Sequence, residues 1–186
     1  MGQLPDNSID LIITDPPYTK EYLYTYDILS QQAPRIMKSG ASMLIIVGHY
    51  AIDYVIKSFD RKLKFQWILC LNQFDGPHPR MLMGIEILWK PVLWYKKDKW
   101  PRGFGFVRDG IIINRSKEYH KWEQDKTFSN YYINKLTRPG FTVLDPFCGS
   151  GSFLLSAKNL NRNYIGFDID QQAVNIAKIR LELGNK

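Results

Sequence analysis

Short apolar runs recur along the chain and alternate with segments in which apolar residues return every three or four positions. The apolar runs cover residues 9–14, 41–48, 64–72, 141–147 and 163–170. Continuous runs of this length are typical of strands that are buried on both faces. Helical patterns lie at 21–38, 50–59, 126–137, 149–160 and 170–183. The alternation predicts an α/β fold, with a mostly parallel sheet and helices on both of its faces.

The stretch after the third apolar run departs from this alternation. Residues 84–97 are predicted as one or two strands, and Pro91 is expected to force an edge or a break because proline lacks a backbone N–H. Asp109 and Gly110 lie between two apolar runs, a pattern that favours a β-hairpin turn. We therefore predict a single domain over residues 1–186, with a small basic β insert over 96–118.

The net charge of +7 is concentrated in one part of the chain. Residues 90–121 carry nine cations and three anions, and aromatic residues lie between them. Cations mixed with aromatic rings suit a polyanion whose bases can stack on the rings. A solvated basic surface without a partner is an equally good interpretation of this stretch taken alone.

Several functional classes are disfavoured by the sequence. The two cysteines, Cys70 and Cys148, and the three histidines show no metal-ligand spacing, so we expect reduced thiols and no metal. The longest apolar runs are too short to cross a bilayer, and the polar start has no secretory segment. A cytoplasmic protein without a membrane partner is expected.

Two of the predicted strands lead into an aspartate that is followed by proline. The first strand leads into Asp15, followed by Pro16, Pro17 and Tyr18, and a simple turn is the plainest interpretation of such a sequence. The strand at 141–147 carries Asp145 at the corresponding position. In a parallel sheet, ligands bind outside the carboxyl ends of the strands. Two acids at such ends can therefore belong to one site.

A glycine-rich turn follows the second aspartate. Gly149 and Gly151 let the backbone approach a ligand closely, and the next strand ends on Asp168, where an acid commonly accepts ribose hydroxyls. The turn lacks the third glycine of a dinucleotide site and the lysine of a P-loop, and no cation follows it before Lys158. An acidic glycine turn suits a cationic nucleoside better than a pyrophosphate, and S-adenosylmethionine is such a cation.

The two motifs together, DPPY at 15–18 and DPFCGSG at 145–151, resemble those of the amino-methyltransferases of DNA. The catalytic motif precedes the cofactor motif and a basic insert separates them, an order similar to that of the beta class. Residues 120–147 also resemble the family, although HKWEQD stands at 120–125 where His-Pro-x-Gln-Lys-Pro is usual. The resemblance implies a Rossmann-like AdoMet-dependent methyltransferase fold, S-adenosylmethionine as cofactor and double-stranded DNA as substrate.

The resemblance also implies roles for individual residues. The Asp15 carboxylate and the Pro16 carbonyl would hold the two hydrogens of an exocyclic amine, Pro17 would help to fix the backbone, and Tyr18 would stack on an extruded base. The implied cofactor-binding residues are Asp145, Pro146, Phe147, Gly149, Ser150, Gly151, Asp168, Trp122 and Gln124. The implied DNA contacts of the insert, the target-recognition element, are Lys96, Lys97, Lys99, Arg102, Arg108, Arg115 and Lys117.

Some alternatives stay open at this point. Aspartate at position 15 mostly accompanies adenine in this family, so N6 of adenine is the expected target, with N4 of cytosine, an RNA substrate or an inactive nucleic-acid-binding relative as alternatives. A homodimer and a restriction partner are also open. The family usually has a Gly-Asp-x-Leu stretch, part of a strand and helix, before residues 4–8, and this sequence begins at Met1. A missing strand would remove a wall of the adenosine pocket, so weak cofactor binding is expected.

Overall fold

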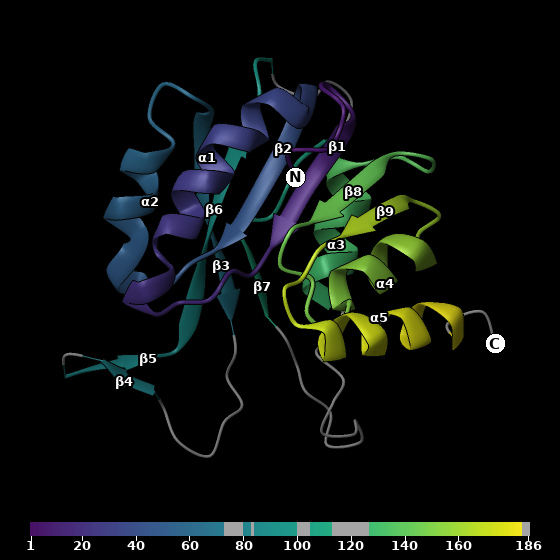
Figure 1. Cartoon of the computed structure of the whole chain (residues 1–186). Coiled ribbons are helices and arrows are strands. Elements are labelled where there is room, and N and C mark those ends of the chain that lie inside the picture. The colour runs from purple at the N-terminus through teal and green to yellow at the C-terminus, as the bar shows by residue number, and fades with distance from the viewer. Residues whose placement is uncertain (73–79, 83, 100–104, 113–126, 184–186) are drawn as a thin grey trace.

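A computed structural model describes residues 1–72, 80–82, 84–99, 105–112 and 127–183 of the chain. A seven-stranded sheet forms its centre, in the order β7-β3-β6-β2-β1-β8-β9 (Figure 1). Its strands are β1 (Ile9–Thr14), β2 (Met37–Ile46), β3 (Lys64–Asn72), β6 (Trp89–Lys96), β7 (Gly110–Ile112), β8 (Thr142–Asp145) and β9 (Asn163–Gly166). A separate ribbon pairs β4 (Arg80–Leu82) with β5 (Ile85–Ile87).

The strands of the large sheet run in one direction, except for β6. Neighbouring strands pair in parallel from β2 through β1 and β8 to β9, and β3 pairs in parallel with β7. Strand β6 is antiparallel to both of its neighbours, β2 and β3. The carboxyl ends of the parallel strands therefore form one edge of the sheet, here called the carboxyl edge. Strand β6 begins at this edge and ends at the opposite one.

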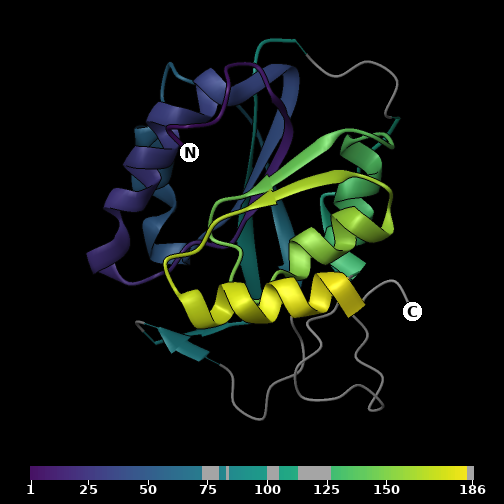
Figure 2. The same cartoon turned by 45° about the vertical axis from the view of Figure 1, so that its right-hand side comes forward.

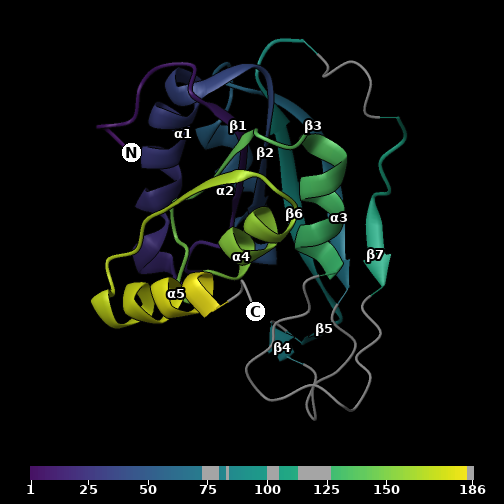
Figure 3. The same cartoon turned by 90° about the vertical axis from the view of Figure 1, so that its right-hand side faces the viewer.

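Helices cover both faces of the sheet, as the sequence predicts (Figures 1 and 2). They are α1 (Tyr24–Ile36), α2 (Ile52–Ser58), α3 (Thr127–Leu136), α4 (Ser152–Asn159) and α5 (Gln171–Leu183), with short 3-10 turns η1 (Lys20–Tyr22) and η2 (His49–Ala51). Helices α1 and α2 pack on one face, α3 and α4 on the other, and α5 packs against α4 (Figure 3). Of the helices in the described ranges, none has the length and apolar character to cross a membrane.

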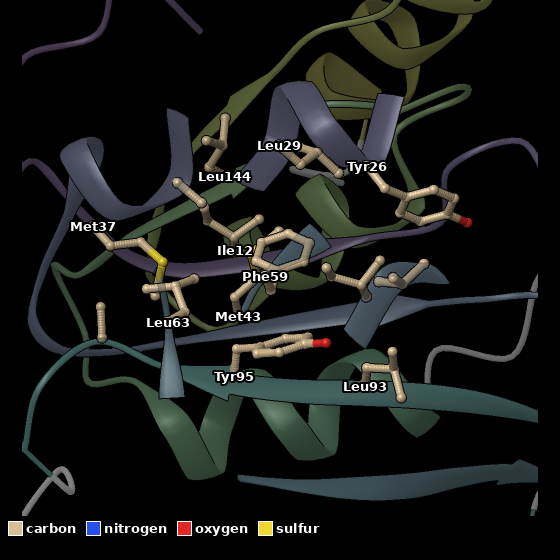
Figure 4. Packing of buried hydrophobic residues seen from close by; sticks show 14 of the residues in the cluster. Ile12, Tyr26, Leu29, Met37, Met43, Phe59, Leu63, Leu93, Tyr95 and Leu144 are labelled. Carbon is tan, nitrogen blue, oxygen red and sulfur yellow. The ribbon is translucent and has the colours of Figure 1, made fainter. Parts of the chain in front are cut away.

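The sheet separates two apolar cores. Side chains of α1, α2 and β6 meet in the first core, where the Phe59 and Tyr95 rings stack at 4.7 Å (Figure 4). All six residues of β1 are buried, with Ile12 in the first core and Leu11 and Ile13 in the second. Strand β1 is thus held from both sides, and the residues that follow it start from a rigid position.

Two predictions about residues 84–112 are wrong. Pro91 lies in the interior strand β6, between β2 and β3, and not at an edge. Its carbonyl accepts the Val47 N–H just beyond the end of β2, and the bond that its nitrogen cannot donate falls beyond the last β2–β6 pair, Ile46 with Val92. Asp109 and Gly110 do not turn a hairpin, since β7 pairs in parallel with β3. The Asp109 carbonyl instead accepts the Cys70 N–H at 2.6 Å, which docks this segment along β3.

Candidate active site

The two strands that end on aspartates are neighbours in the sheet. Strands β1 and β8 pair in parallel, with Leu11 opposite Val143. The Thr14 hydroxyl donates to Oδ1 of Asp145 at 2.8 Å, so the last residue of β1 bridges the two strand ends. Asp15 follows directly. The two motifs therefore open onto the same carboxyl edge, which is the geometry that methyl transfer between them would require.

The corner after β1 brings together a carboxylate, a phenol and an ammonium group. The Tyr18 hydroxyl donates to Oδ1 of Asp15, and Lys90 Nζ lies 3.2 Å from the Tyr18 oxygen and 3.9 Å from Oδ2 of Asp15. Burial raises the pKa of Asp15, while Lys90 and the Tyr18 hydrogen bond oppose this rise. The Asp15 side chain keeps 32% of its surface exposed, so this carboxylate remains accessible to a ligand.

The prolines of this corner differ in exposure. Pro16 is buried and Pro17 is exposed, and Tyr18 packs against the second core. Gly48, just beyond β2, lies beneath the tyrosine: a Cβ added there would be 3.7 Å from the Tyr18 Cβ. The corner is thus supported by the core below it and open on its outer side.

The corner after β8 is closed around its carboxylate. Asp145 is only 2% exposed and accepts hydrogen bonds from the Thr14 hydroxyl and the Phe147 N–H. Burial raises the pKa of Asp145 to about 7, because these two hydrogen bonds do not offset the loss of hydration. Pro146 is buried, and Phe147 packs on the first core.

The glycine turn is bound to the end of β9. Gly149 and Gly151 have φ angles of +47° and +81°, which L side chains rarely adopt. The Gly149 N–H donates to Oδ2 of Asp168 at 2.7 Å, and the Cys148 N–H donates to the Phe167 carbonyl. Asp168 therefore lies beside the turn, as its position in the sequence predicts.

Helix α5 fixes the other side of the turn. A Cβ added to Gly151 would lie 2.9 Å from the Cβ of Ala177, so only glycine fits this approach. Arg180 donates from Nη1 to the carbonyl and the hydroxyl of Ser150, both at 2.8 Å. The expectation that no cation lies beside the turn holds only for neighbours in sequence, because α5 brings Arg180 back to it.

Of the predicted DNA contacts, the four that the structure describes do not gather at this site. Lys96, Lys97 and Lys99 follow β6 to the edge opposite Asp15, where Lys97 donates to Asn7 and to the Met37 carbonyl. Arg108 is exposed beside α3, and its backbone is held by the hydroxyls of Tyr131 and Tyr132. The remaining predicted contacts and two predicted cofactor contacts lie outside the described residues: Arg102, Arg115, Lys117, Trp122 and Gln124.

Sequence reasoning missed Lys90 and Arg180. Lys90 was counted only as part of the basic stretch. A residue near the start of an antiparallel strand lies at the carboxyl edge of the sheet. The residues of β6 do not reveal that this strand is antiparallel. Arg180 lies in α5, and the spacing of the apolar residues in this helix does not reveal that Arg180 contacts Ser150.

Comparison with known proteins identifies relatives along almost the whole chain. The family model N6_N4_Mtase, described as DNA methylase, matches residues 114–179. Type II methyltransferase M.HpaI of Haemophilus parainfluenzae is 28% identical over 98% of this chain and 71% of that protein. The crystal structure of the M1.HpyAVI-SAM complex superposes with a TM-score of 0.74 at 26% identity, covering 94% of this chain and 89% of that one.

A more distant structure shares the fold alone. The PvuII DNA methyltransferase, titled cytosine-N4-specific, gives a TM-score of 0.79 at 17% identity, over 96% of this chain and 81% of that one. The architecture of this protein is thus an α/β Rossmann-like methyltransferase fold, as predicted.

Proposed function

We propose that this chain, which belongs to the DNA amino-methyltransferase family, transfers a methyl group from S-adenosylmethionine to the exocyclic N6 of adenine in DNA. The Thr14–Asp145 hydrogen bond carries the proposal, because it places the Asp15 corner and the glycine turn side by side at one edge. Aspartate at position 15 favours adenine over cytosine within the family that the chain resembles.

The residues around the glycine turn fit a cationic nucleoside. When bound, S-adenosylmethionine supplies an electrophilic methyl group on a positively charged sulfur. Asp168 is partly exposed and each of its oxygens accepts one backbone N–H, which leaves acceptor capacity for ribose hydroxyls. Asp145 adds a second acid below the turn, and the Arg180 Nη1 donors are taken up by Ser150. Two carboxylates and one guanidinium group thus lie beside the turn, and the Nη1 of this guanidinium donates to the turn itself.

Asp15 prepares the target amine for attack. The lone pair of an exocyclic amine is delocalised into the ring, so the nitrogen needs acceptors that hold its hydrogens and favour a pyramidal geometry. The Asp15 carboxylate accepts one hydrogen, and the Pro16 carbonyl accepts the other. As the new N–C bond forms and the S–C bond breaks, the nitrogen loses a proton to Asp15, which passes it to solvent. Holding the base in line with the methyl group provides much of the rate enhancement.

Tyr18 has to change partners for this reaction. The Tyr18 hydroxyl donates to Oδ1 of Asp15, the oxygen that an amine would approach. An extruded base costs roughly a few kcal/mol in lost stacking, which an aromatic ring can partly restore. We therefore assign the Tyr18 ring to stacking on the base. Arg108 stays a proposed DNA contact, whereas Lys96, Lys97 and Lys99 have no part in this mechanism.

Methyl transfer followed by nucleoside analysis tests the proposal. Unmethylated plasmid DNA is incubated with the protein and methyl-labelled S-adenosylmethionine, digested to nucleosides and analysed by mass spectrometry. Labelled N6-methyladenine is expected. Labelled N4-methylcytosine would contradict adenine as the target and show that the same mechanism acts on cytosine N4. Absence of transfer with retained DNA binding would contradict the proposal and leave a binding protein.

A further inference from the structure

The ammonium group of Lys90 lies inside the Asp15 corner although no sequence motif includes it. It lies 3.9 Å from Oδ2 of Asp15, 3.2 Å from the Tyr18 oxygen and 5.0 Å from the centre of the Tyr18 ring. The side chain is 24% exposed, so it is held in the site and not extended into solvent. The nitrogen donates to the Tyr18 oxygen, lies at ion-pair distance from Asp15 and lies over the Tyr18 ring. A bound target base would likewise bring a nitrogen to Asp15 and a planar group to this ring.

We propose that Lys90 takes the place of the target amine in the DNA-free protein, and that the extruded base displaces its ammonium group toward a DNA phosphate. This inference rests on the proposed function, because the displacing group is the substrate base. Lys90 is then a positioning residue. Before the base arrives it holds the Tyr18 and Asp15 side chains next to each other, and afterwards it binds the phosphate of the nucleotide that carries the base.

The charge changes of the reaction explain why the ammonium group must leave. The target nitrogen becomes more positive as it is methylated, and a fixed cation beside it would raise the energy of the transition state. DNA supplies an anionic destination, since every extruded nucleotide carries a phosphate close to its base. Movement of Lys90 to that phosphate removes the unfavourable charge and adds a DNA contact.

The groups that face Asp15 come from three elements and from the corner itself. They are Lys90 of β6, Tyr18 of the same corner, Tyr26 of α1 and Asp145 of β8. Lys90 is the cation in this set, and it lowers the pKa of Asp15 against the effect of burial. Replacement of Lys90 by a neutral residue should therefore raise the pKa of Asp15, whereas removal of a distant lysine should not.

The first measurement uses the protein without DNA or cofactor. The side-chain carboxyl of Asp15 is followed by carbon-13 NMR across pH, and an Asp15→Asn variant assigns its signal. The titration midpoint should move to higher pH in Lys90→Gln and return toward the wild-type value in Lys90→Arg. Lys64→Gln is the matched control, because Lys64 is exposed and begins β3 at the edge opposite Asp15. An unchanged midpoint in Lys90→Gln would overturn the inference.

The second measurement tests the displacement. DNA affinity is measured at several salt concentrations. Lys90→Gln should lower the slope of log Kd against log salt by about 0.9, the change expected when one phosphate contact is lost. Lys64→Gln should keep the wild-type slope. A wild-type slope in Lys90→Gln would refute the move to phosphate. Failure of the proposed function is seen separately, as absence of methyl transfer by the wild-type protein, and the NMR result does not depend on it.

Discussion

Asp15 and Asp145 both lie at the carboxyl ends of neighbouring strands, yet their surroundings differ sharply. Asp145 is the last residue of β8 and lies level with Ile13, whereas Asp15 follows β1 two residues further along. Asp145 is closed off, with two fixed donors and a pKa raised to about 7. Asp15 is one-third exposed and lies beside Lys90 and the Tyr18 hydroxyl, which donates to it. A common position in the sheet thus gives one buried carboxylate that organises the turn and one accessible carboxylate suited to chemistry. Environment, and not residue type, separates their roles.

The largest effect is expected from removing the accessible carboxylate. Asp15→Ala should reduce the single-turnover rate of methyl transfer by about 10²- to 10⁴-fold, because no group would accept the hydrogen of the amine. DNA and cofactor binding should be kept. Asp53→Ala is a suitable control, since Asp53 is exposed on α2 and pairs only with Lys57 among the described residues. Full turnover by Asp15→Ala would remove Asp15 from its role.

The buried carboxylate should affect cofactor binding instead. Asp145→Asn should weaken S-adenosylmethionine binding by about tenfold or more, as expected for loss of an interaction with a charged group. In the wild-type protein, affinity should rise with pH through about 7, where Asp145 loses its proton and attracts the cation more strongly. Calorimetry at pH 6 and pH 8 measures both effects. The same pH dependence in the Asn variant would show that another group is responsible.

The raised pKa of Asp145 also has a consequence for stability. The folded state holds this proton more tightly than the unfolded chain does, so the contribution of Asp145 to stability should fall as pH rises from about 4 to about 7. Asp145→Asn should lack this part of the pH dependence. Urea denaturation at several pH values, without cofactor, gives the comparison.

The glycine turn offers a smaller test that separates conformation from packing. Gly151→Ala should lower the free energy of unfolding by about 2–4 kcal/mol, because a positive φ and the contact with Ala177 both oppose a Cβ. Gly140 has a similar φ of +83° but no neighbour within 4 Å, so Gly140→Ala should cost only about 1–2 kcal/mol. If thermal denaturation shows equal losses of unfolding free energy for Gly151→Ala and Gly140→Ala, the contact of Gly151 with Ala177 of α5 does not contribute.

The smallest effect is expected at Tyr26, which lies behind the Asp15 corner. Its hydroxyl is fully buried and has no hydrogen-bond partner among the described residues. Tyr26→Phe should therefore be neutral or stabilising by up to about 1 kcal/mol in the ligand-free protein, as judged by denaturation. A clear loss of stability would indicate a partner for this hydroxyl, such as a bound water molecule.

The sequence by itself determined most strands, the helices and the two aspartate corners, because apolar runs, helical spacing and the chemistry of a turn depend on neighbouring residues. The expected burial of β3 on both faces is wrong, since Phe65, Trp67 and Ile68 are exposed. It also placed Asp168 beside the glycine turn, since parallel strands end at a common edge. Helix α5 was less well predicted: Ile176 and Ile179 are half exposed although their spacing suggests a buried face.

Only the tertiary structure decided which distant residues share the site. The antiparallel direction of β6 takes Lys96 to the far edge and brings Lys90 to Asp15, and the return of α5 supplies Arg180 to Ser150. Strand order and direction depend on long-range pairing, which periodicity within a segment does not encode. For the same reason, the different burial of Asp15 and Asp145 could not be predicted from two similar motifs.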